Sequence, residues 1–190
     1  VLLLETAVNG LLCSSDFVLF VALWGLLLLP MYLLIRIWGG PGARRAAAWF
    51  AGFQALSLVL IIATVAIIIV EAGKQTSDMT PDLVSFTRTA ETVGFWLSFA
   101  GFGIAMAIFP VHTWMVEAQS KASAGVATIL SGTMLMLGAY GMMRISLVVF
   151  PAPAHYHSFS IPAPAVAAAL CGAAGAFRPG TCPPSTPYVH

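Results

Sequence analysis

Long apolar stretches constrain this chain more than any other feature. Of its 190 residues, 59% are hydrophobic and only 8% are charged, whereas soluble domains carry about 25% charged residues. An α-helix rises about 1.5 Å per residue, so about 20 apolar residues cross the hydrocarbon core of a bilayer. A globular core could not hide this much apolar surface. We therefore predict an all-α, polytopic membrane protein with lipid as its solvent.

Five or six apolar segments are long enough to predict transmembrane helices. The predicted helices cover residues 1–15, 16–38, 46–70, 89–109, 122–150 and, as a weaker alanine-rich segment, 162–177. The short join Ser14–Asp16 supplies N-cap residues for the second helix. The glycines and proline of Gly39–Gly42 stop that helix and turn the chain.

The chain divides into three parts by composition. A transmembrane helix bundle is predicted over 1–151, a further weak transmembrane helix over 152–177, and a tail over 178–190. The tail is rich in proline and glycine and has no helical period, which predicts either disorder or an aberrant reading frame. Because the chain begins at Val1, without Met or a basic leader, we expect it to be a piece of a longer protein.

The charged residues predict an orientation in the membrane. The join after the second helix carries Arg36, Arg44 and Arg45 and no acid, whereas the loop 71–91 carries four acids against two basic residues. The positive-inside rule places the basic join in the cytoplasm and the acidic loop outside. The helix at 122–150 then also begins inside, which is a consistent topology.

The most unusual segment separates two apolar runs and reads Phe109-Pro110-Val111-His112-Thr113-Trp114. Proline lacks a backbone N–H and cannot continue a helix. Lipid offers no hydrogen-bond partner for backbone groups that are freed by a break, and transporters use broken helices to line ion paths. We therefore predict a helix break at Pro110.

Two ionisable residues are candidates for a proton path because charged groups in membrane spans are costly and usually functional. Glu5 lies within an apolar run. It is either a buried carboxylate that takes part in proton transfer or a carboxylate in water near the helix end. His112 changes charge near neutral pH, which suits a proton relay. It could also bond the carbonyl groups freed at the break.

Three further charged residues complete the candidates. Glu117 and Lys121 are four residues apart, which places them on one face of a helix in the favourable order. We interpret them as a solvated surface pair, or else as a pair that couples this chain to the charges of a neighbouring one. Arg144 either extends to the outer interface or anchors an internal carboxylate. Gln54 and Ser57 could hydrogen-bond between helices, although packing is the preferred interpretation.

Other chemistry is not indicated. The sequence has no phosphate-binding glycine loop and no assignable catalytic triad. Its three cysteines, Cys13, Cys171 and Cys182, lack metal-ligand spacing. A net charge of +1 argues against nucleic acid as a partner. We therefore expect no catalytic residue, metal site or cofactor site in this chain, and a lipid bilayer around it.

Five places in the sequence resemble subunit M (subunit 4 in mitochondria) of proton-pumping NADH:quinone oxidoreductase, respiratory complex I. They are Leu2–Glu5, Trp24–Gly40 with its Pro30-Met31-Tyr32 motif, Phe109–Trp114, Ala124–Arg144, and Phe150–Pro151. The wider family includes subunits of multisubunit sodium/proton antiporters and of energy-converting hydrogenases. The resemblance covers about 1–151 and implies an antiporter-like bundle that is the central part of a larger fold.

The resemblance also implies that charged residues within the spans relay protons. The position of the family's glutamate in the second helix is Gly25 in this chain, and the positions of its two lysines are Ala105 and Met136. The scaffold is therefore matched, whereas the usual relay charges are replaced.

By this resemblance, we expect a membrane-arm subunit of a complex I-like assembly in a bacterial inner membrane, associated with proton translocation coupled to electron transport. NADH, quinone, flavin and iron–sulfur clusters would then be bound only by partner subunits. Two alternatives stay open. The chain could belong to a sodium/proton antiporter or a hydrogenase, or it could be a non-conducting structural or decayed copy.

Overall fold

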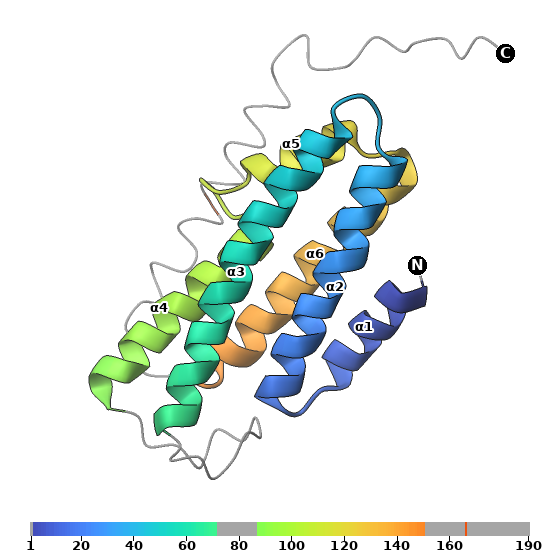
Figure 1. The fold of residues 1–190 in the computed structure, drawn as a ribbon. Helices are drawn as coiled ribbons and strands as arrows, with labels where there is room; N and C mark the ends of the chain where they lie inside the picture. Colours follow the sequence, from blue (N-terminus) through green and yellow to red (C-terminus); the bar gives the residue numbers. More distant parts are fainter. Residues whose placement is uncertain (1, 72–86, 151–165, 167–190) are drawn as a thin grey trace, which may run out of the picture.

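The computed structural model describes residues 2–71, 87–150 and Val166, and these ranges form a helical bundle without β-strands (Figure 1). The helices are α1 (Leu2–Cys13), α2 (Phe17–Trp38), α3 (Ala43–Glu71), α4 (Arg88–Ala105), α5 (Thr113–Lys121) and α6 (Ala124–Gly141), and a π-helical segment (Met142–Leu147) continues α6. The predicted all-α class is confirmed.

Three helices in the described ranges are long and apolar enough to cross a membrane. They are α2 with 22 residues, α3 with 29, and α6 with its π-helical continuation, together 24. α1 has only 12 residues, fewer than the about 20 that span the hydrocarbon core. The predicted helix at 162–177 and the tail at 178–190 lie outside the described residues, apart from Val166.

The two short joins have the predicted chemistry. Asp16 is the N-cap of α2, and its carboxylate accepts a hydrogen bond from the Val18 N–H at 3.0 Å. Gly42, just before α3, has a φ of +92°. An L side chain is strained in that region, so glycine is the residue that allows α2 and α3 to turn back on each other.

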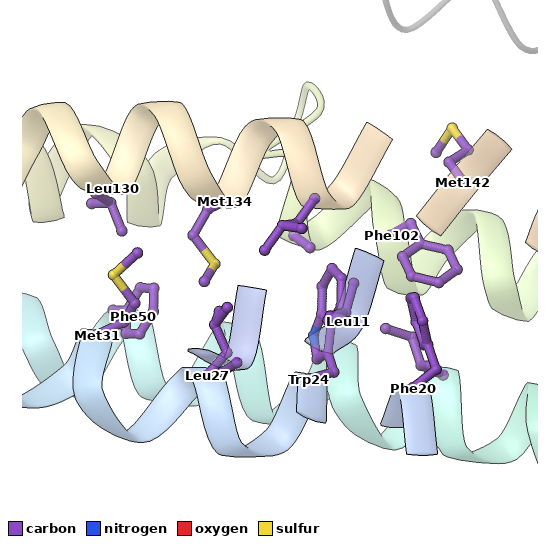
Figure 2. Close-up of a cluster of buried hydrophobic side chains, with 14 of the residues drawn as sticks. Leu11, Phe20, Trp24, Leu27, Met31, Phe50, Phe102, Leu130, Met134 and Met142 are labelled. Carbon is purple, nitrogen blue, oxygen red and sulfur yellow. The ribbon is translucent and has the colours of Figure 1, made fainter. Parts of the chain in front are cut away.

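α3 packs against α2, α4 and α5, whereas α1 packs on α2 and α6 contacts α4, α5 and α2. The centre of the bundle is aromatic. The Trp24 ring stacks on Phe20 at 5.8 Å and meets the edge of Phe102 at 5.5 Å. Figure 2 shows these rings with Met134 of α6 among the buried side chains. A Cβ on Gly141 would overlap the Phe102 ring, so a glycine here lets α6 approach α4 closely.

The helix ends are paired at both ends of the bundle. At one end, the Gly40 N–H donates to the Lys121 carbonyl at 2.8 Å, so the α2–α3 turn and the end of α5 lie together. This agrees with the prediction that both joins face the same side. At the other end, the Glu71 carboxylate accepts from the N–H and the hydroxyl of Thr87, both at 3.2 Å.

Candidate functional site

The predicted break is present between α4 and α5, but α4 ends earlier than expected. The last residue of α4 is Ala105, and α5 begins at Thr113. The prediction of a helix up to 109 is therefore wrong at its end. Ala107 has a φ of +55°, a left-handed conformation that reverses the chain before Pro110 is reached.

A hydrogen-bond pattern explains where α4 stops. The Ile108 N–H donates to the Gly103 carbonyl at 2.9 Å, and the Ala107 N–H donates to the Ile104 carbonyl at 3.1 Å. These two bonds form a Schellman motif, in which the left-handed position is usually glycine. An alanine holds that position here. The motif satisfies carbonyl groups that would otherwise be unpaired inside an apolar bundle.

Trp114 closes the break from the other side. Its indole N–H donates to the Ile104 carbonyl at 3.0 Å, its side chain is fully buried, and its ring lies 5.6 Å from that of Phe50 on α3. Trp114 was recognised only as part of the segment Phe109–Trp114, and no role was predicted for its side chain. The sequence did contain a signal for this role, namely a tryptophan four residues after a helix-breaking proline. A buried indole N–H usually finds a hydrogen-bond partner, and a helix break frees carbonyl groups that can accept it.

His112 occupies the N-cap position of α5, but its side chain makes no capping bond. Its Nδ1 atom is buried without a partner among the described residues, and its ring stacks on Phe109 at 5.6 Å. The interpretation that His112 bonds the freed carbonyl groups is wrong, because Trp114 provides that bond. Its role as a proton relay stays a prediction.

Buried polar groups lie on α3 and where α4 meets α3 and the π-helical segment. The Ser57 hydroxyl donates to the Gly101 carbonyl at 2.7 Å, so this residue bonds between helices rather than only packing. The Ser146 hydroxyl donates to the Ser98 hydroxyl at 2.9 Å. Gln54 is also fully buried, and neither atom of its amide has a partner among the described residues.

The three positions that lack the family charges do not converge on one site in the described structure. Ala105 is fully buried, next to Gly138 of α6. Gly25 is half-buried and faces Leu58 of α3. Met136 is 74% exposed on α6. Of the three, only Ala105 therefore lies in the core that the described helices form among themselves.

Glu5 lies in the first turn of α1, and its side chain is exposed. This exposure among the described helices does not select between the two interpretations, so a role of Glu5 in proton transfer stays a prediction. A carboxylate in the first turn also interacts favourably with the positive end of the helix dipole.

Glu117 and Lys121 share one face of α5, as predicted, and both are half-buried. The structure shows no ion pair between them. The Lys121 stem instead lies against the α2–α3 turn, where its Cε would be 3.7 Å from a Cβ on Gly42. The sequence predicted a solvated surface pair, whereas in the described structure the two side chains share a face, are half-buried and do not pair.

Arg144 joins the π-helical segment to α1. Its guanidinium contacts the Tyr140 hydroxyl and donates to the Leu12 carbonyl at 3.4 Å, and the Tyr140 hydroxyl donates to the same carbonyl at 3.0 Å. A cation at a helix C-terminus is favourable. The interpretation that Arg144 anchors an internal carboxylate is not supported, because its contacts are a carbonyl and a phenol.

The fold and the break define an integral membrane protein whose apolar bundle contains a discontinuous helix. Comparison with known proteins identifies the family. Residues 14–179 match the family described as NADH:quinone oxidoreductase/Mrp antiporter, transmembrane, and the chain belongs to it.

Curated relatives agree with this assignment. The chain is 37% identical over 152 residues to NAD(P)H-quinone oxidoreductase chain 4 1 of Picosynechococcus sp., which covers 80% of this chain and 28% of that protein. It is 36% identical over 152 residues to chain 4 2 of Microcystis aeruginosa, which covers 79% of this chain and 28% of that protein. The chain therefore spans just over a quarter of the length of these relatives.

Two solved structures share the fold. A chain of respiratory complex I from Thermus thermophilus with bound NADH aligns with a TM-score of 0.74 at 22% identity, over 81% of this chain and 33% of that one. A chain of the Mrp complex from Dietzia sp. aligns with a TM-score of 0.68 at 26% identity, over 78% of this chain and 28% of that one.

Proposed function

We propose that this chain forms part of a membrane-arm subunit of a complex I-like NADH:quinone oxidoreductase. The observation that carries the proposal is the 37% identity to NAD(P)H-quinone oxidoreductase chain 4 over 80% of the chain. The discontinuous α4–α5 unit supports it, because broken helices in membranes line ion paths. The protein would then act in proton translocation coupled to electron transport.

Among the proton-path candidates, we propose that His112 exchanges protons at the break. It is the one ionisable side chain within the segment that joins α4 to α5, and its Nδ1 is free of protein partners in the described residues. Glu5 is exposed and Glu117 and Lys121 are half-buried in the described bundle, and we propose that they meet neighbouring subunits. Arg144 holds α1 in place.

We further propose that residues 1–151 form the antiporter-like bundle and that 152–177 adds a further helix. NADH, quinone, flavin and iron–sulfur clusters would be bound by partner subunits, as expected for a membrane-arm subunit of such an assembly. Other membrane subunits would be the partners. The location would be a bacterial inner membrane.

The test is copurification of the tagged chain from native membranes in mild detergent, followed by native electrophoresis and mass spectrometry. We expect a large assembly that contains NADH-oxidising or quinone-binding subunits. A chain that migrates alone, or only with antiporter subunits, would contradict the proposal.

A second candidate is a subunit of a sodium/proton antiporter. It is favoured by the shared fold with a chain of the Mrp complex, at 26% identity. Sodium-dependent proton exchange in inverted vesicles that contain the intact assembly would support it. Exchange that does not depend on sodium would exclude it.

A further inference from the structure

The outer face of α3 carries a hollow of about 440 Å³, which we name the α3 groove. The described residues that line it all belong to α3 and are Arg45, Ala48, Trp49, Gly52, Phe53 and Leu56. Residues three and four apart share a helix face, so this lining is one continuous face. Phe50 and Ser57, which contact α5 and α4, lie on a different face. The α3 groove therefore faces away from the described bundle.

A glycine opens the middle of the α3 groove. A Cβ on Gly52 would meet nothing within 4 Å among the described residues, so the missing side chain leaves open space. Trp49 and Phe53 flank this space with stacked rings whose centroids are 5.8 Å apart, and Leu56 lies one turn further on and is 50% exposed. The groove is thus an apolar channel along a helix long enough to span a membrane. A flexible alkyl chain fits such a channel, whereas a polar ligand would lose its hydration there.

The α3 groove is positively charged at one end, where Arg45 lies in the first turn of α3 with its side chain exposed. The Gly40 N–H donates to the Lys121 carbonyl, so the α2–α3 turn and the end of α5 meet at this end. In the described residues, the last turn of α2, the first turn of α3 and the helix α5 carry four basic side chains against one acid; the basic residues are Arg36, Arg44, Arg45 and Lys121, and the acid is Glu117. This end of the bundle therefore attracts anions.

The length of the α3 groove matches one leaflet of a bilayer. The helical rise of about 1.5 Å per residue separates Arg45 from Leu56 by roughly 16 Å, about half of the 30 Å hydrocarbon core. Tryptophan is enriched at the membrane interface, and Trp49 lies one turn below Arg45. The positive-inside rule places this end of α3 in the cytoplasm. The leaflet is then the cytoplasmic one, which carries anionic lipids.

We propose that the α3 groove binds one anionic phospholipid, with its phosphate on Arg45 and one acyl chain across Gly52 between Trp49 and Leu56. A guanidinium binds a phosphate through two parallel N–H donors. A zwitterionic lipid brings a cation of its own, so it leaves the excess basic charge at this end uncompensated. Lipid binding here does not depend on the proposed function in electron transport.

Native mass spectrometry of the full chain in detergent micelles tests this, because it resolves the binding of single lipids. The probes are phosphatidylglycerol and phosphatidylcholine with identical acyl chains. We expect the first phosphatidylglycerol to bind at a several-fold lower concentration than the first phosphatidylcholine. Arg45→Gln should remove this preference. Arg44→Gln is the matched control, since Arg44 is also exposed but does not line the groove, and it should leave the preference in place.

A second pair of variants tests the channel for the acyl chain. Gly52→Leu fills the groove and should weaken binding of phosphatidylglycerol several-fold. Gly132→Leu is its control, because Gly132 is likewise exposed on α6 with nothing within 4 Å of a Cβ among the described residues. It should leave that binding unchanged.

Three results would overturn the proposal. The first is equal binding of the two lipids, and the second is equal loss in Arg44→Gln and Arg45→Gln, which would indicate attraction to surface charge alone. The third comes from native membranes, where Gly52→Cys carries a short thiol-linked photo-cross-linker. A cross-link to another protein chain would show that a neighbouring subunit occupies the α3 groove, whereas a cross-link to phospholipid is the expected result.

Discussion

The indole nitrogen of Trp114 lies 3.0 Å from the carbonyl oxygen of Ile104, across the break between α4 and α5. The same carbonyl accepts the Ala107 N–H at 3.1 Å. The end of one half-helix is thus held by a side chain of the next. In an apolar bundle this bond matters more than on a surface, because no solvent replaces it.

Trp114→Phe should lower the free energy of unfolding by about 1–3 kcal/mol, because it removes a buried hydrogen bond while the ring contact with Phe50 persists. The measurement is reversible unfolding in mixed micelles. Trp49→Phe is the control, since Trp49 is 48% exposed and stacks on Phe53. It should change stability by less than about 0.5 kcal/mol. Equal losses in both variants would contradict the assigned role of Trp114.

Ala107→Gly should stabilise the protein by about 1 kcal/mol. The left-handed φ of +55° is unfavourable for alanine and is accessible to glycine without strain. The matched control is Ala105→Gly, two residues earlier at the last helical position of α4. There glycine should destabilise by about 0.5–1 kcal/mol. The same sign of change at both positions would show that the left-handed turn does not govern the end of α4.

Gly141→Ala should destabilise the bundle by about 1–3 kcal/mol, because its Cβ would overlap the Phe102 ring. Gly132→Ala on the same helix has no atom within 4 Å of the new Cβ. It should instead stabilise α6 by about 0.5–1 kcal/mol. Thermal unfolding in detergent distinguishes the two. A gain for Gly141→Ala would exclude close packing of α6 on α4 at this point.

Tyr140→Phe and Arg144→Gln should not be additive, because both side chains bond the Leu12 carbonyl. A double-mutant cycle on unfolding free energies should give a coupling of about 0.5–3 kcal/mol. Pairing Tyr140→Phe with Thr6→Ala, whose hydroxyl bonds only within α1, should give a coupling near zero. A coupling near zero for the first pair would mean that α1 is held by other contacts.

Much of the fold could be predicted from local pattern. Apolar run length identified α2 and α3 nearly to their ends, and the glycines at 39–42 predicted the turn between them. The end of α4 could not be predicted in this way. The proline at 110 was a visible signal. The left-handed alanine at 107 was not, because its conformation depends on hydrogen bonds to the carbonyl groups of Gly103 and Ile104.

The candidate site was predicted less completely than the fold. His112 was identified from its chemistry, but its expected bond to the freed carbonyl groups belongs to Trp114. Gln54 was interpreted as a packing residue, because a single glutamine in an apolar helix carries no sign of its surroundings. The Gln54 amide is buried because α3 packs against α4. These helices are far apart in the sequence, so this burial could not be predicted from local pattern.

By itself, the sequence determined that this protein is an all-helical membrane protein with a broken helix, since apolar length and a helix-breaking proline are local properties. Only the tertiary structure decided which groups close that break and which buried polar atoms have no hydrogen-bond partner among the described residues. The physical reason is that a hydrogen bond in an apolar interior is specified by its partner, and here the partners come from different helices.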